Sequence, residues 1–482
     1  MIRKWGVEKF RSIHKAKLDL APLTIFTGVN NSGKSAFIES MAFMAQSLRG
    51  NKKSIELNGD LVELGNFEEN YSNNDPEKSN TIDIYFESEK HPYVDDEYYP
   101  SCYYECGYYN KNDIYSFQDP KDEPSKAPSY PTRYEKIKHN YDWNDCGEGK
   151  IEESIVEIPI YDVPDFFSVS LEEQRSSDRN NPASLRVAKI ELEARDGNDP
   201  YYEEDYDHIS YDEHIFTSEE RLGIINEFLG IYFSPENFRY LGLFRSPDPS
   251  KQKSYGEDEY VNSDGNNTFA VLNKFIKKED SNVLYCLPDV LENKEYNGKK
   301  RYTLIHTIDC WLKHFELGDT CRVLNGEILF NIDGREYTLR QLGSGVSQIL
   351  PIWVMCLTAP PNSTIIIEEP EAHFHPKVQA RLADFFIAIA LTGRQCIIET
   401  HSEYLIEQLR YRIVKTKQDI LKKTKLYFAA KQDGISHFRD IEINEYAALD
   451  DWPEDFFDES HKISNEIMKE VVRKWETTKQ ND

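Results

Sequence analysis

The pattern of apolar and polar positions predicts two strands and a helix in the first 50 residues. Residues 2–10 and 16–27 are typical of strands, and the second segment ends in a compact apolar run, 23–26, before a glycine turn. Apolar residues at helical spacing then predict a helix over 34–49, with Gly50 ending it. The first 50 residues therefore predict a strand, a turn and a helix in direct succession.

The same alternation of strands and helices returns near the other end of the chain. Residues 364–367 and 395–398 predict two buried strands, and helices are expected over 376–391 and 402–414. Because parallel strands need helical crossovers, this alternation predicts an α/β fold with a mixed or parallel sheet covered on both faces. A hairpin is predicted over 425–443, within a small α+β module.

Charge and tyrosine content single out the middle of the chain. The whole sequence carries a net charge of −28, of which −23 falls within residues 71–220, together with 18 of the 30 tyrosines. We interpret this region as an acidic β-rich insertion, since disordered segments are poor in aromatic residues; a disordered spacer is the alternative. The predicted divisions are 1–70, 71–235, 236–415 and 416–482, with the insertion second and the small module last.

Composition narrows the class of protein. With 482 residues the chain can hold two or three domains, and no apolar stretch approaches the length of a membrane span. The first residues lack the features of a signal peptide, so a cytoplasmic protein is expected. The eight cysteines are too scattered for a disulfide framework. The acidic balance disfavours nonspecific coating of DNA, and direct binding of nucleic acid stays open.

The segment 28–35 carries the strongest chemical signal. It reads Gly28-Val29-Asn30-Asn31-Ser32-Gly33-Lys34-Ser35, a P-loop pattern placed after a strand and at the start of a helix. In that setting the backbone amides wrap phosphates, Lys34 contacts the β- and γ-phosphates and Ser35 holds Mg²⁺. The sequence therefore predicts an ATP and Mg²⁺ site.

Two further strands end in polar residues that suit this site. The strand 364–367 leads into Glu368, which we assign to the metal, and Glu369, which we assign as the general base. His401 follows the strand 395–398, at the crevice where open α/β sheets bind ligands. Ser344 and Gly345 lie in a turn before the apolar helix 349–357, a second anion-binding terminus.

Together these four blocks resemble the ABC-type ATPase head of the structural-maintenance and recombination ATPases. The resemblance implies that Ser344 and Gly345 cap the ATP of a second copy, in an ATP-bridged homodimer or a higher oligomer. It also assigns Arg11 as a phosphate contact and His401 as a switch histidine. Glu368 stands where the family has aspartate, and the signature turn reads Ser-Gly-Val-Ser-Gln instead of Ser-Gly-Gly-Gln.

Four shorter segments look like a bacterial group related to the overcoming-lysogenization-defect ATPases, without a topoisomerase-primase domain. They are 62–67, 240–247, 370–376 and 451–457. Within 370–376, His373 and His375 are expected to form a structural turn and not a metal site. Such ATPases often accompany a separate nuclease or toxin in anti-phage defence, which implies a switch that controls such an effector. The acidic insertion could dock a basic partner or be a solvated face.

Two other functions remain open on these observations. A DNA repair or recombination ATPase would act on DNA directly and show DNA-stimulated turnover. An assembly scaffold would bind ATP with little hydrolysis.

Overall fold

The chain forms two units. The computed structural model describes residues 1–49, 55–71, 81–88, 133–139, 154–160, 166–174, 184–193, 208–211, 218–245, 259–277, 282–284, 286–292, 301–324, 327–342, 344–416, 419–449, 463 and 466–471. The first unit comprises Met1–Glu89, Phe166–Leu192 and Ile209–Asp482, and the second comprises Lys90–Asp165 and Glu193–His208. The second unit contains an antiparallel hairpin of β6 (Arg133–His139) and β7 (Ser154–Ile160).

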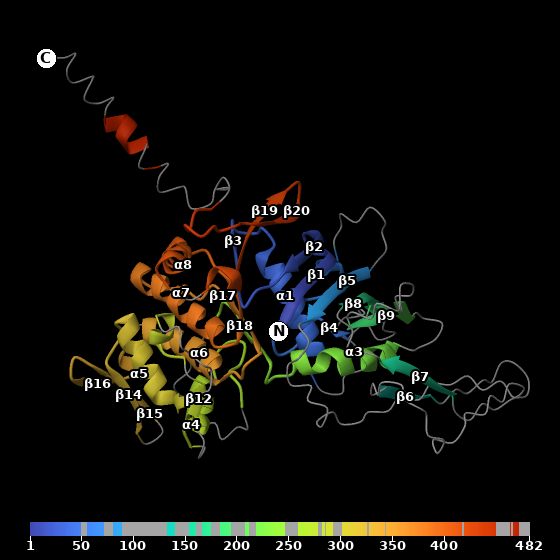
Figure 1. Ribbon diagram of the computed structural model, residues 1–482, viewed down its shortest axis with the longest axis horizontal. Helices are drawn as coiled ribbons and strands as arrows, with labels where there is room; N and C mark the ends of the chain where they lie inside the picture. Colours follow the sequence, from blue (N-terminus) through green and yellow to red (C-terminus); the bar gives the residue numbers. More distant parts are fainter. Residues whose placement is uncertain are drawn as a thin grey trace, which may run out of the picture. The chain divides into compact units, whose positions relative to one another are not determined.

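A six-stranded sheet forms the centre of the first unit (Figure 1), in the order β11-β17-β18-β3-β19-β20. Its strands are β11 (Phe238–Leu241), β17 (Thr364–Glu368), β18 (Gln395–Glu399), β3 (Leu23–Gly28), β19 (Thr424–Gln432) and β20 (Ile435–Asp440). Neighbours from β11 to β19 are parallel, and β20 returns antiparallel to β19. The fold is therefore α/β with a mixed sheet, as the sequence predicts.

Helices cover this sheet on both faces. They include α1 (Lys34–Ser47), α5 (Leu304–Phe315), α6 (Ser344–Thr358), α7 (Pro376–Leu391) and α8 (Glu403–Lys415). Successive residues of a strand point to opposite faces, so Ile25, Ile367 and Ile398 join the core formed with α5, α6 and α7. Phe26 points the other way and lies 5.3 Å from Phe37 of α1, centroid to centroid. Apolar side chains thus pack against both faces of the sheet.

A second sheet packs against the far side of α1. Its order is β10-β9-β8-β5-β1-β2, with β4 beside β9. The strands are β1 (Ile2–Phe10), β2 (Ile13–Asp19), β4 (Ile55–Glu56), β5 (Thr81–Ser88), β8 (Phe166–Gln174), β9 (Ser184–Glu193) and β10 (His208–Tyr211). The indole Nε1 of Trp5 on β1 donates a hydrogen bond to Ser40 Oγ on α1, at 2.8 Å.

Shorter elements complete the first unit. They are α2 (Phe67–Asn70), α3 (Ser218–Phe233), α4 (Thr268–Lys277), β12 (Asn282–Leu284), η2 (Pro288–Leu291), β13 (Arg301–Thr303), β14 (Thr320–Leu324), β15 (Glu327–Ile332), β16 (Arg335–Thr338), η3 (Leu339–Gln341) and η4 (Leu421–Lys423). Among the described residues, no helix combines the length and apolar character needed to cross a membrane.

The predicted strand 16–27 is wrong as a single element, because the chain changes sheets inside it. Residues 16–19 belong to β2, whereas 23–27 belong to β3. The break falls at Pro22, which has no N–H for a strand ladder, and Thr24 Oγ1 accepts the hydrogen bond of the Ala21 N–H at 2.8 Å. The helices predicted over 34–49, 376–391 and 402–414 agree with α1, α7 and α8 to within two residues.

The structure also differs from the sequence in where it places the insertion and the hairpin. Within 71–235, β5 pairs directly with β1, since its alternating apolar side chains, Ile82, Ile84 and Phe86, are buried. The predicted hairpin forms β19 and β20, but β19 pairs with β3 in the central sheet instead of belonging to a separate module. The tyrosine-rich runs and the segment 451–457 lie outside the described residues.

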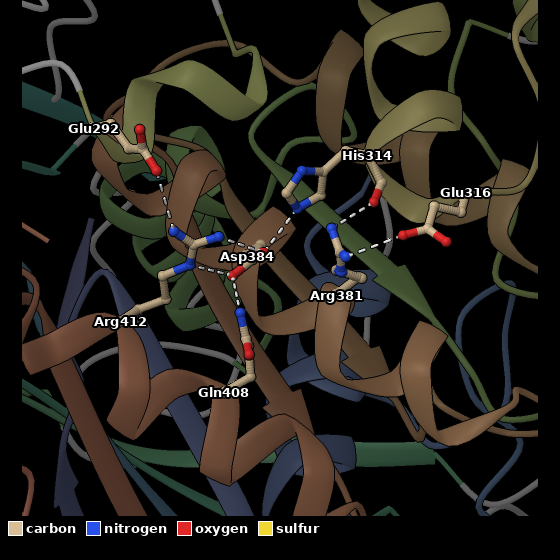
Figure 2. Close-up of polar contacts among 7 residues, drawn as sticks. All are labelled: Glu292, His314, Glu316, Arg381, Asp384, Gln408 and Arg412. Carbon is tan, nitrogen blue, oxygen red and sulfur yellow. Dashed lines mark hydrogen bonds and ion pairs between the residues drawn. The ribbon is translucent and has the colours of Figure 1, made fainter. Parts of the chain in front are cut away.

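A buried polar network ties three of the helices together (Figure 2). Asp384 of α7 is fully buried and accepts hydrogen bonds from His314 of α5 at 2.7 Å and from Gln408 of α8 at 2.9 Å. Arg412 of α8 donates two more, at 2.6 and 2.8 Å. Burial alone would raise the pKa of Asp384, but these hydrogen bonds outweigh it and hold the pKa at about 2. The network therefore contains a carboxylate that stays ionised.

Candidate active site

The loop between β3 and α1 is shaped by two glycines. Gly28 ends β3 with φ 132° and Gly33 precedes α1 with φ 96°, both in the left-handed region that favours glycine. A Cβ atom at Gly28 would lie 2.1 Å from the backbone oxygen of Ala429, and one at Gly33 would lie 2.2 Å from Ser436 Oγ. Both contacts come from the β19–β20 hairpin, which therefore forms one wall of the loop.

Lys34 occupies the centre of this loop. Its side chain is buried, and Nζ donates hydrogen bonds to the carbonyls of Gly28 at 3.1 Å and Val29 at 2.8 Å, and lies 3.4 Å from Ser32 Oγ. Burial lowers the pKa of Lys34, while the neighbouring carboxylate of Glu399 opposes that shift. The ammonium is thus placed where a phosphate chain would meet the loop amides.

The tip of the loop is open to solvent. Asn30 and Asn31 are exposed, and Asn31 adopts φ 60°, a left-handed conformation that asparagine tolerates. Ser32, in contrast, is buried beneath the loop. The tip of the loop is thus accessible to a ligand from solvent.

Glu399 lies next to the start of α1. It ends β18, the immediate neighbour of β3, and Ser35 Oγ donates a hydrogen bond to its Oε1 at 2.9 Å. Lys34 Nζ lies 4.0 Å from the same oxygen. Burial raises the pKa of Glu399 to about 7 despite the opposing charge of Lys34. Glu399 lies two residues before His401, and no role is predicted for it from the sequence.

Glu368 faces the other neighbour of β17. Its Oε1 accepts a hydrogen bond from the hydroxyl of Tyr240 on β11 at 2.6 Å, and both side chains are buried. Burial raises the pKa of Glu368 to about 8 and also raises that of Tyr240. Glu368, the predicted metal ligand, is therefore hydrogen-bonded to Tyr240. Ser35 instead has Glu399 as its partner.

Glu369 and His401 come together at the sheet edge. Glu369 adopts φ 40°, its N–H donates to the Glu399 carbonyl at 2.8 Å, and its Oε1 lies 3.6 Å from His401 Nε2. The His401 N–H donates to Glu371 Oε1 at 2.6 Å. Burial and the charge of Lys34 lower the pKa of His401, which favours a neutral imidazole.

Arg245 contacts the backbone of the turn that follows β17. Its buried guanidinium donates from Nη2 to the carbonyls of Glu368 and Glu369, the latter at 2.9 Å. The Arg245 carbonyl accepts a hydrogen bond from Gln348 Nε2 of α6 at 3.2 Å. Burial lowers the pKa of Arg245 to about 10, a value at which it stays charged near neutrality. Arg245 thus joins the turn that follows β17 to the helix that carries the predicted signature.

Arg11 contacts residues of α1 and α2, and the predicted signature residues lie at the start of α6. The Arg11 guanidinium forms an ion pair with Glu39 of α1 and donates from Nε to Asn70 Oδ1 at 2.9 Å. The predicted turn before a helix at 349–357 is wrong, because α6 already begins at Ser344. Among the described residues, a Cβ at Gly345 would meet Leu317 Cδ2 alone, at 4.0 Å. A phosphate contact for Arg11, and contacts of Ser344 and Gly345 with a second copy, remain predictions.

His375 caps a helix, as expected for a structural turn. Its Nδ1 accepts the N–H of Lys377 at the start of α7. His373 adopts φ 67° in the preceding turn.

The donor atoms at this edge fit ATP together with a divalent cation. Side-chain ligand atoms of Glu369, Glu399 and His401 lie within 4.8 Å of one another, and Ser35 Oγ adds a hydroxyl. Glu399 Oε2 is buried and makes no hydrogen bond within the described part of the chain. Hard cations such as Mg²⁺ prefer oxygen ligands, and a buried unsatisfied oxygen is the atom that such an ion would satisfy.

Solved structures with similarity include two with named organisms. The SMC head domain from Thermotoga maritima matches with 10% identity and a TM-score of 0.38, covering 92% of this chain and 99% of that chain. The Smc head domain derived from Pyrococcus furiosus, bound to the C-terminal domain of ScpA, matches with 12% identity and a TM-score of 0.38, covering 97% and 99%. A search among curated proteins found no match.

Two families match the sequence itself. Residues 422–467 match the family described as "Protein of unknown function (DUF3696)". Residues 1–406 match the family described as "AAA ATPase domain", a range that contains the P-loop, both acidic strand ends and His401. The chain therefore belongs to the AAA ATPase domain family, and it is an ATPase.

Proposed function

We propose that the protein is a cytoplasmic ABC-type switch ATPase that dimerises on ATP and controls a separate nuclease or toxin in anti-phage defence. The observation that supports the hydrolytic part is the meeting of Lys34, Glu369 and His401 at one sheet edge, with Glu369 Oε1 3.6 Å from His401 Nε2. A phosphate-binding cation and a carboxylate able to orient water are the two groups that phosphoryl transfer needs.

The residues divide the reaction between them. The loop from Gly28 to Ser35 binds the phosphates through its amides and Lys34. Ser35 holds Mg²⁺ together with a carboxylate from the end of β17 or β18. When bound, Mg²⁺ neutralises charge on the phosphates. Glu369 accepts the proton of the attacking water, and His401, as a neutral imidazole, positions that water beside the γ-phosphate.

Dimerisation would complete the site. Ser344 begins α6, and the N-terminus of a helix favours anions through its free N–H groups. In the proposed dimer, Ser344 and Gly345 of one copy cap the ATP bound to the other. Hydrolysis then removes the γ-phosphate that joins the two copies, so that the assembly state reports on the nucleotide.

A mass measurement with and without ATP tests the switch. Glu369→Gln is expected to lower kcat by at least about 100-fold, because it removes the general base, and to trap the ATP-bound state. Light scattering should then give twice the monomer mass of 56.3 kDa in ATP and the monomer mass without it. Lys34→Ala is the matched control and should stay monomeric in both. A trapped variant that remains monomeric in ATP rules out the proposed dimer.

Co-purification tests the effector. The motifs at 62–67, 240–247 and 370–376 support this part of the proposal through the resemblance they carry. The tagged chain expressed from its native locus should bring down a nuclease or toxin in fixed stoichiometry, and Lys34→Ala should abolish phage protection. Recovery of the chain alone with DNA-stimulated turnover would favour direct action on DNA, and protection by Glu369→Gln would favour a scaffold.

A further inference from the structure

Glu399 has the features of the metal-binding carboxylate, a role assigned to Glu368 from the sequence. One of its carboxylate oxygens accepts the hydroxyl hydrogen of Ser35 at 2.9 Å, and Ser35 is the P-loop position that holds the cation. The other oxygen makes no hydrogen bond in the described part of the chain, and the residue is only 3% exposed. A buried carboxylate oxygen without a donor is costly unless a cation or a proton satisfies it.

Glu368 lacks both features. Tyr240 donates to its Oε1 at 2.6 Å, and the backbone of Leu243 supplies a further hydrogen bond. Both donors come from β11 and the residues that follow it, on the side of β17 opposite to β18. The carboxylate of Glu368 is therefore directed toward protein donors, and a cation at Ser35 would have to compete with them.

Strand order explains the difference between the two acids. Glu368 and Glu399 are register partners at the ends of parallel β17 and β18, so both reach the same edge. However, β18 lies between β17 and β3. Glu399 is consequently the strand-end acid adjacent to the loop that carries Ser35, and Glu368 is one strand farther away.

We infer that Glu399, and not Glu368, supplies the carboxylate that binds the divalent cation together with Ser35. This inference rests on the proposed nucleotide site. Glu368, held by Tyr240, instead fixes the end of β17, from which Glu369 projects toward His401. The cation would also lie within reach of Glu369, whose ligand atom is within 4.8 Å of that of Glu399.

Manganese binding measures the assignment without relying on turnover. The full chain is titrated with Mn²⁺ in the presence of a non-hydrolysable ATP analogue, and free Mn²⁺ is followed by electron paramagnetic resonance. Glu399→Gln keeps the shape of the side chain and removes its charge, so Mn²⁺ affinity should fall at least about tenfold. Glu368→Gln is the matched control, with the same chemical change on the neighbouring strand, and should stay within about threefold of the wild type. The reverse order of the two variants overturns the assignment.

A second measurement separates this inference from the proposed site. Binding of a fluorescent ATP analogue in EDTA should be similar in the wild type and Glu399→Gln, whereas Mg²⁺ should strengthen binding in the wild type alone. If the wild type binds no nucleotide in either buffer, the proposed site itself fails and the assignment falls with it. If Glu399→Gln proves unfolded by circular dichroism, Glu399→Asp replaces it. That variant keeps the charge and should bind Mn²⁺ more weakly than the wild type; unchanged affinity overturns the inference.

Discussion

Replacing Asp384 with asparagine should destabilise the first unit because it removes the buried counter-charge of Arg412. The other acid near Arg412, Glu292 at 3.9 Å, is 71% exposed and compensates little. Asp384 is fully buried, and two of its four hydrogen bonds come from Arg412, whose side chain is 9% exposed. Breaking a buried ion pair by removing one partner costs about 3–5 kcal/mol. The pKa of Asp384 gives a second figure, since a fall from 3.8 to about 2 corresponds to about 2 kcal/mol of stability at neutral pH.

The pH dependence of this effect has a definite sign. The folded pKa of Asp384 lies below its unfolded value, so its contribution is complete above about pH 4 and is lost as the pH falls toward 2. The gap between wild type and Asp384→Asn should therefore be widest near pH 7 and shrink below pH 4.

Urea denaturation followed by tryptophan fluorescence measures the loss, because the ring of Trp311 lies 5.4 Å from that of His314 in the network. Glu316→Gln is the matched control: Figure 2 shows Glu316 paired with Arg381, and its side chain is 55% exposed. An exposed pair contributes little to stability, because water and salt screen its charges. A loss in Asp384→Asn no larger than in Glu316→Gln, or a gap that widens as the pH is lowered from 5 to 3, would refute the reasoning.

Three further outcomes follow from the site. Arg245→Ala should lower kcat about 10- to 100-fold in steady-state ATPase assays and change KM less than threefold. The reason is that the carbonyls of Glu368 and Glu369 lose their donor. An effect on KM alone would contradict this prediction. Gly28→Ala should lower the thermal midpoint sharply, since its Cβ would lie 2.1 Å from a backbone oxygen of β19, whereas Gly223→Ala in α3, with nothing within 4 Å, should be neutral or stabilise by about 0.5–1 kcal/mol. Burial raises the pKa of Glu368 from 4.5 to about 8, so stability present below pH 4.5 should be lost as the pH rises through 8, on the order of 5 kcal/mol. Urea denaturation of Glu368→Gln should show a flatter profile.

The local elements could be predicted from the sequence because their signals are local. The apolar run at 364–367 and the proline at the start of 376–391 define β17 and α7 within a residue. The neighbours of a strand are different, since they are set by packing across the whole unit. The parallel pairing of β3 with β19 joins residues about 400 positions apart, and no composition signal marks it.

The candidate site shows the same division. Lys34, Glu369 and His401 could be proposed because each follows a strand that the apolar pattern reveals. Glu399 also ends such a strand, but its importance depends on β18 lying next to β3, which the sequence does not state. Arg245 lies in the segment 240–247 that carries the resemblance, but its role could not be read from that segment, because its partners are backbone carbonyls more than 120 residues away.

The position of β19 beside the P-loop has a consequence for protein synthesis. Thr27 pairs with Phe428, so β3 gains this neighbour only after about 400 further residues have been translated. At roughly 5–20 residues per second, that interval lasts about 20–80 s. Throughout it the ribosome displays a strand with unpaired backbone groups, a template for pairing with other chains. The nucleotide loop is thus among the first segments to be made and among the last to gain its full set of neighbours.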